Sequence, residues 1–216
     1  AVASAFNASF GGASGTTKAV ANHAAVVATS VGSDALLTTS AGAGISIRTE
    51  TSGTGATAHA SNAVYALFGA NAKSDVQATA NITATTTVEA GAVLTAPGSP
   101  IEVITDSDNL AVATLSTQSG AALNFSDASV TPRATGTTTT TFRGSVGTKT
   151  AAGASKLTIQ AKSKVEAVSS YSGSGGGAIS ITGGNATASA TSTVTLTVGG
   201  TGSVINVAGD IDLAGL

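Results

Sequence analysis

Two pairs of aspartates are the residues of this chain whose type and spacing could bind a metal ion. Asp106 and Asp108 lie two positions apart, and Asp210 and Asp212 repeat that spacing near residue 216. In an extended strand, residues two apart point to the same side, and carboxylates supply the oxygen ligands that Ca²⁺ prefers. The four aspartates are therefore candidate calcium ligands, and calcium is the one cofactor that the sequence suggests.

More specific signatures of metal binding or catalysis do not occur. The stretch Gly199-Gly-Thr-Gly-Ser-Val204 resembles a calcium-binding repeat but has Val where that repeat needs Asp. His23 and His59 lie in alanine-rich stretches without an acidic or cysteine partner nearby, so we expect ordinary strand residues there. No Gly-x-Ser-x-Gly elbow is present. We therefore expect a protein that is not an enzyme, with no catalytic and no cofactor-binding residues.

Charge and composition exclude further classes of function. Nine basic and 11 acidic residues give a net charge of −2, whereas a nucleic-acid-binding protein needs a basic face. No stretch reaches the ~18 consecutive apolar residues that suggest a membrane helix. The absence of cysteine is compatible with export to an oxidising environment. We expect no nucleic-acid partner, no membrane insertion by this segment, and an export signal that lies outside it.

The chain is built from the residues that favour strands and turns. Ala, Val, Ile and Leu alternate with Thr and Ser, 27 glycines punctuate them, and only 3% of residues are aromatic. In the first full copy of the pattern we expect short strands at Val26–Val31, Ala35–Thr39 and Ile45–Glu50, separated by Gly or Ser. Alanine-rich Thr57–Ala66 has some helix propensity, but its equivalent one period later, Ala113–Ala122, contains Ser-Gly, so we expect strand there too.

The pattern repeats at a nearly constant distance along the chain. Apolar-polar-apolar triplets begin at Ile45, Ile101, Leu157 and Ile211. A second marker, the runs that begin at Ala66, Ala122 and Ala178, has the same period. Self-similarity at a fixed period of this size, about 56 residues, is typical of solenoids and other repeat architectures. We expect one continuous solenoid over 1–216, cut from a longer array, with partial repeats at 1–25 and 193–216 and full repeats at 26–82, 83–136 and 137–192.

A unit of this size with about six short strands cannot enclose its own apolar residues. We expect each repeat to form two coils of about 27 residues, stacked in parallel at ~4.8 Å per coil into an all-β parallel β-helix, or β-solenoid, about 40 Å long. The alternative is an antiparallel sandwich of tandem modules, which small size and few aromatic residues disfavour.

The period also aligns charged and hydroxyl residues into columns. Asp106 falls in the column of Lys162, and Asp108 in that of Lys164, so with two coils per repeat each pair would be ~10 Å apart. The acidic second and basic third repeats would then either dock laterally against a neighbouring rod or form two solvated bands. Runs of Thr at 83–87, 137–141 and 191–197 would recur only in every second coil, which is sparse for binding an ice lattice.

The frame Thr-x-Thr-Val-x-x-Gly-x-x-Leu-Thr-Ala…Ile-x-Val, with Ala-x-Ala runs and a Gly-Gly-Ala-x-x-Ile turn, resembles the repetitive regions of filamentous-haemagglutinin-type bacterial surface adhesins. Residues 204–215, Val-Ile-Asn-Val-Ala-Gly-Asp-Ile-Asp-Leu-Ala-Gly, are similar to one of their recurrent coils. The resemblance implies a right-handed β-helix that is exported to the cell surface or extracellular matrix.

These observations lead to a structural hypothesis. We expect a structural and adhesive segment of a long secreted bacterial surface or biofilm-matrix fibre, which acts as a stiff spacer and contact surface. Its partners would be other copies of itself, through end-to-end stacking or lateral bundling, and polysaccharide or a host or neighbouring cell surface. A polysaccharide-binding β-helix is the alternative, and a polysaccharide-degrading β-helical enzyme is a further one.

Overall fold

The computed structural model describes the backbone of residues 1–216 and every side chain except that of Thr54. The described chain is all-β, with long strands and no helix, and in particular no helix long and apolar enough to cross a membrane. The strands are β1 (Val2–Ser9), β2 (Gly12–Val31), β3 (Leu36–Thr38), β4 (Ile45–Ala66), β5 (Gly69–Val88), β6 (Val93–Gly120), β7 (Leu123–Phe142), β8 (Ser145–Val146), β9 (Ala154–Gly176), β10 (Ile179–Ala186), β11 (Ser189–Val198) and β12 (Ile211–Gly215).

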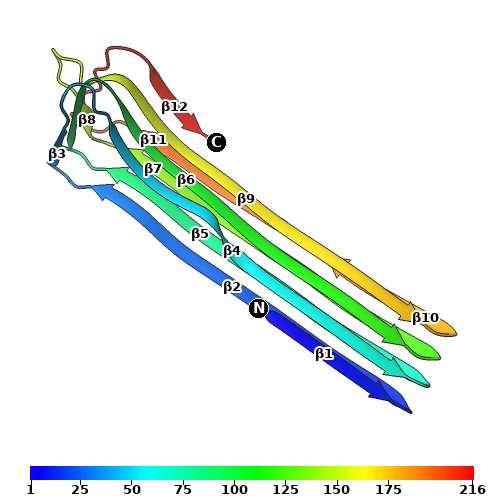
Figure 1. Cartoon of the computed structure of the whole chain (residues 1–216). Helices are drawn as coiled ribbons and strands as arrows, with labels where there is room; N and C mark the ends of the chain where they lie inside the picture. The colour runs from blue at the N-terminus through cyan, green and yellow to red at the C-terminus, as the bar shows by residue number, and fades with distance from the viewer.

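The strands form two parallel sheets, and the chain alternates between them. Sheet A has the order β1-β4-β6-β9-β12, with β3 and β8 beside β6, and sheet B has the order β2-β5-β7, with β10 and β11 both beside β7. Two-residue connections join the sheets at one end of the molecule, and longer loops with β3 and β8 join them at the other (Figure 1). The all-β class with the parallel sheets of a solenoid is confirmed, and the antiparallel sandwich is wrong because every strand pair is parallel.

The expected coil length is wrong, because one repeat makes one coil. The triplet residues Ile45, Ile101, Leu157 and Ile211 are direct register partners on neighbouring strands, so residues one repeat apart lie side by side rather than two coils apart. The second marker holds only in part. Leu123 pairs with Ile179, its expected equivalent in the next repeat, but in the preceding repeat it pairs with Gly69 and not with Leu67.

Strands continue through glycine positions that we expected to separate them. Register shifts lie between Thr51 and Thr54 and between Ala96 and Pro100, and each contains a glycine with positive φ, Gly53 or Gly98. A bulge absorbs one extra residue of β4 at the first shift and two extra residues of β6 at the second, while the rest of each strand keeps its partners. Because the ladder hydrogen bonds on both sides persist, these glycines bend a strand without reversing the chain, and the coil becomes twice as long as predicted.

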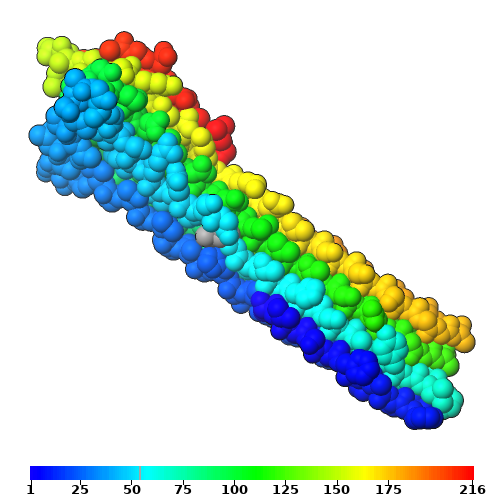
Figure 2. Space-filling model, in the orientation of Figure 1, coloured from blue at the N-terminus to red at the C-terminus, as the bar shows by residue number. Residues whose placement is uncertain are grey.

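The molecule is a long narrow blade whose length follows the strands (Figure 2). A strand of 20 residues, such as β5, extends about 66 Å at 3.3 Å per residue. Stacking advances only ~4.8 Å per coil. The expected rod with two short coils per repeat is therefore wrong. Each repeat instead forms one wide coil and adds a single stacking step.

The core between the sheets changes in character along the blade. Its middle is filled by fully buried alanines, which let the sheets approach closely. Towards the loop end, larger side chains take over, and Phe142 is 0% exposed there. The largest fully buried members of this end cluster are Phe142, Leu94, Ile101, Leu157 and Ile159.

Inward-facing threonines clamp the two sheets together between these core regions. One hydrogen bond recurs in three successive coils, from a Thr hydroxyl of sheet B to a carbonyl of sheet A. The donors are Thr29, Thr86 and Thr140, and the acceptors, in the same order, are the carbonyls of Arg48, Ile104 and Gln160, at 3.0, 3.2 and 2.8 Å. In return, Thr49 and Thr105 donate to the carbonyls of Thr85 and Thr139 at 2.9 and 3.1 Å. We call this set of hydrogen bonds the threonine clamp, and it satisfies polar groups that burial would otherwise penalise.

Candidate functional surfaces

The first pair of candidate calcium ligands lies on the outer face of sheet A. The alternating burial of residues 105–108 turns Asp106 and Asp108 to the same, outer side, as predicted. Their register partners are Lys162 and Lys164, and the Lys164 Nζ lies 3.9 Å from Asp108 Oδ1. The carboxylate of Asp108 therefore faces an ammonium group, which competes with a cation for the same oxygen.

The second pair lies elsewhere. Asp212 is the register partner of Thr158 and accepts a 2.8 Å hydrogen bond from the Gln160 side chain, while Asp210 precedes β12. The structure thus does not bring the two aspartate pairs together. Among the described residues, no cluster of three or more His, Cys, Asp or Glu side chains is arranged to hold a metal ion.

The two histidines also lie apart. His59 is exposed on the outer face of sheet A, where its neighbours are Val2 and Thr114. His23 lies half-buried on β2, in register with Ala80, and its Nε2 has no hydrogen-bond partner among the described residues. Neither histidine faces a carboxylate or a nucleophile that would form a catalytic pair.

Of the two sheets, sheet A carries more of the charge. Its Arg48, near the start of β4, has one guanidinium nitrogen 2.7 Å from Glu102 Oε2 and another 3.0 Å from Glu50 Oε1. The hydrogen bond to Glu102, followed by that to Glu50, raises the pKa of Arg48 above its ordinary value. The guanidinium therefore stays charged, and its exposed ion pairs fix side-chain positions on this face more than they stabilise the fold.

The charged columns are closer together than expected, and the predicted gap of two coils is wrong. Asp106 and Lys162, like Asp108 and Lys164, sit on adjacent strands β6 and β9, because one repeat is one coil. The acidic and basic bands therefore neutralise each other within the same face. This arrangement removes the main argument for docking an acidic band against a basic band of a neighbouring rod.

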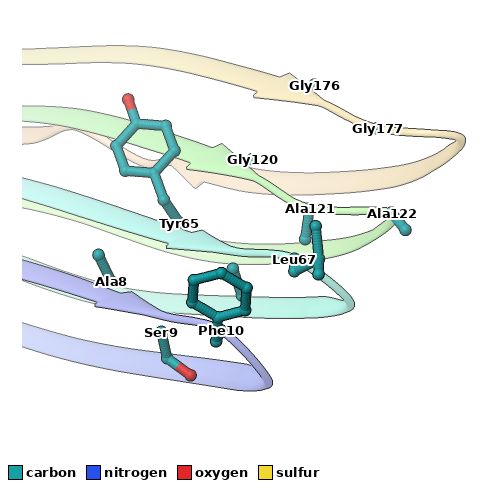
Figure 3. Close-up of a pocket in the computed structure, with 11 residues that line it drawn as sticks. Ala8, Ser9, Phe10, Tyr65, Leu67, Gly120, Ala121, Ala122, Gly176 and Gly177 are labelled. Carbon is teal, nitrogen blue, oxygen red and sulfur yellow. The ribbon is translucent and has the colours of Figure 1, made fainter.

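An open apolar groove of about 740 Å³ crosses the tight-turn end of the blade (Figure 3). Tyr65 lies over Gly120, its strand neighbour, and its hydroxyl is 3.0 Å from the Gln118 side chain. Phe10 and Leu67 come from two successive turns and are 90% and 54% exposed. The turns themselves are hydrogen-bonded from coil to coil, for example from Ala122 N to Leu67 O at 3.3 Å. The groove is therefore a feature that each coil extends by one step.

The outer face of sheet B carries a two-dimensional array of threonines near the loop end. Three consecutive strands each present three outward threonines, and the register places them in three straight columns. We name these nine residues the threonine array. Its columns are Thr83, Thr137 and Thr193; Thr85, Thr139 and Thr195; and Thr87, Thr141 and Thr197. The expectation that the Thr runs recur only in every second coil is therefore wrong, since they recur in every coil.

The array is free of charge and of competing hydrogen bonds. After Asp75, β5 has no charged residue, and neither has β7 after Arg133, while β11 has none. In the part of the chain that the structure describes, none of the nine hydroxyls is bonded to another protein group. The inward threonines of the same strands, Thr86 and Thr140, are by contrast fully bonded in the clamp. The alternating Thr residues of the sequence would predict the array if the length of one coil were known.

The blade thus presents three different surfaces: a charged face, an apolar tip and an uncharged hydroxyl face. None of them contains a recognisable catalytic arrangement among the described residues. Comparison of the chain with models of protein families, with curated proteins and with solved structures found no match.

Proposed function

We propose that this chain is a structural and adhesive segment of a secreted bacterial surface or matrix fibre, built as a right-handed β-solenoid. The observation that carries the proposal is the register of both sheets, in which each coil repeats the one before it and only two bulges interrupt the pairing of sheet A. The right hand follows from the strong preference of parallel crossover connections for that sense. The role is mechanical and adhesive, not enzymatic.

The dimensions favour a contact surface over a spacer. About 56 residues lengthen a fibre by a single ~4.8 Å step. A spacer built in this way needs many residues for little length. The same residues add two strips of sheet, each about 66 Å wide at 3.3 Å per residue. Selection for reach would favour short coils, so the breadth of these sheets points to the faces as the working part of the fibre.

Partners of the same kind fit the open edges of the sheets. β2 is paired on one side only among the described strands, and its inward residue Val27 is 37% exposed, whereas its register partner Ala84 is fully buried. An unpaired parallel edge with an uncovered core is a template for another coil. The isolated chain would therefore stack end to end with other copies.

A pair of lysine variants on β2 tests this proposal. Val27 points into the open end of the core, whereas Val26 points outward in the column of Thr83 and is 79% exposed. An inward charge on an edge strand blocks pairing, so Val27→Lys abolishes the concentration-dependent filaments expected of the wild-type chain, and Val26→Lys leaves them. Sedimentation velocity and electron microscopy measure the outcome. A wild-type chain that stays monomeric at high concentration contradicts the proposal.

Polysaccharide binding is a second candidate function, and the tip groove favours it. The rings of Tyr65 and Phe10 line the groove, and the Phe6 ring centroid lies 6.2 Å from that of Tyr65, so exposed aromatic rings gather at this end. Aromatic faces pack well against the apolar faces of sugars. Binding of the monomeric Val27→Lys variant to a glycan array would support this function independently of fibre formation.

A further inference from the structure

We propose that the threonine array is an ice-binding surface, which holds an ordered layer of water and through it adsorbs to the face of an ice crystal. The inference does not depend on the adhesive role, because it concerns the outer face of sheet B alone. It follows from four properties of that face: regular spacing, rigid side chains, a fixed backbone and hydroxyls without protein partners.

The spacing of the array is regular in two dimensions. Neighbouring threonines in a strand, such as Thr137 and Thr139, are about 6.6 Å apart, and neighbours across strands, such as Thr85 and Thr139, are about 4.8 Å apart. Water molecules in hexagonal ice repeat over distances of this size along two directions of its prism faces. A flexible glycan chain does not need such a two-dimensional match, whereas a crystalline solid does.

The side chains that form the array are stiff. Threonine is branched at Cβ, so few χ1 rotamers are available to it in a sheet, and Thr83, Thr85 and Thr87 are half-buried by their neighbours. The register places identical residues side by side from strand to strand. Because each side chain has few rotamers to lose, the array loses little entropy when it binds a solid.

The backbone beneath the array is held by the threonine clamp. The carbonyls of Thr85 and Thr139, two members of the array, accept hydrogen bonds from Thr49 and Thr105 of the opposite sheet. Next to Thr139 on the same strand, the inward hydroxyl of Thr140 donates a 2.7 Å hydrogen bond to the Thr105 hydroxyl. Cross-links directly below the surface keep the strands in place, as the binding of a crystalline solid requires.

The hydroxyls of the array are available to water. None of the nine is bonded to another protein group in the described structure, so each can donate to and accept from surface water. The absence of charge matters equally, since ions hold strongly oriented hydration shells that do not fit an ice lattice. Sheet A fails this criterion because it carries charged residues such as Arg48, Asp106 and Lys162.

Two tyrosine variants on β7 test the proposal. Thr139 is the central residue of the array, and Thr131 lies eight residues earlier on the same strand and the same outer side, but outside the array. We expect the wild-type chain to be incorporated into slowly growing ice, to shape ice crystals and to show thermal hysteresis. Thr139→Tyr removes most of this activity because the ring lifts the surface away from the ice, whereas Thr131→Tyr retains it.

Circular dichroism and the melting temperature establish that both variants are folded. If Thr139→Tyr does not fold, Thr139→Lys and Thr85→Lys make the same test with smaller steric demands. Exclusion of the wild-type chain from ice, equal loss in Thr131→Tyr, or full activity in Thr139→Tyr would each overturn the proposal. So would adsorption to crystalline cellulose or chitin without adsorption to ice, which would assign the array to a polysaccharide solid.

Discussion

Replacement of Phe142 by alanine is expected to lower the free energy of unfolding by about 3–5 kcal/mol. Phe142 is the largest side chain that is fully buried, and it stands in one column between Val88 and Val198 at the loop end of the core. Removal of the ring leaves a cavity between two sheets that are cross-linked nearby by the threonine clamp, so the walls cannot collapse into it.

Phe10 provides the matched control for this variant. It is 90% exposed at the tight-turn end, and Phe10→Ala should change the free energy of unfolding by no more than about 0.5 kcal/mol. Urea unfolding at low protein concentration, where the chain is monomeric, measures both. Equal effects of the two substitutions would show that the loop-end core does not pack as described.

Replacement of Asn109 by aspartate is expected to cost about 3–5 kcal/mol at neutral pH, because it buries an uncompensated charge. The Asn109 side chain is 0% exposed, and its amide nitrogen donates to the carbonyls of Thr135 and Ala80 at 2.6 and 3.3 Å. A carboxylate of the same shape would point one negative oxygen, in place of the amide nitrogen, at both carbonyl oxygens. The variant replaces two hydrogen bonds with two repulsions.

The cost of Asn109→Asp should depend on pH in a defined direction. Burial beside carbonyl oxygens raises the folded-state pKa of the new carboxyl above its unfolded value of about 3.9. The folded state then binds the proton more tightly, so the destabilisation is smallest below the unfolded pKa and grows as the pH rises towards the folded pKa. Urea titrations from acid to neutral pH measure it. Asn185→Asp, at an exposed position on β10, should show little effect, and a pH-independent loss at residue 109 would contradict the described burial.

The sequence predicted which residues share a column of the fold, because apolar triplets mark the columns. Residues such as Ile45 and Ile101 must point inward in each coil, and their spacing survives the bulges between them. The strand class was predictable for the same reason, since alternation of apolar and polar residues is continuous. The predicted strand Ile45–Glu50 and the strand assignment of Thr57–Ala66 are both confirmed as parts of β4.

The coil length could not be predicted from local chemistry. Glycines at 53 and 98 have the same turn propensity as those at true connections, and only the neighbouring strands decide whether the chain bulges or reverses. The real reversals include Ala121-Ala122, which carry no glycine or proline. Since the distance between columns depends on the coil length, the same error hid the threonine array and overestimated the separation of Asp106 from Lys162.

Cysteine cross-linking tests the central claim, one coil per repeat, most directly. The chain has no cysteine of its own, so Asp106→Cys with Lys162→Cys places two thiols at register partners on adjacent strands. The Cα separation of such neighbours falls in the range of about 4.4–6.8 Å that a disulfide spans. Asp106→Cys with Lys164→Cys is the control, since that pair is offset by two residues. We predict that the first pair oxidises rapidly and completely and that the second does not. Mass spectrometry of the monomer measures the extent of oxidation. Failure of the first pair to oxidise, as expected if an intervening coil held the thiols about 10 Å apart, would contradict the account.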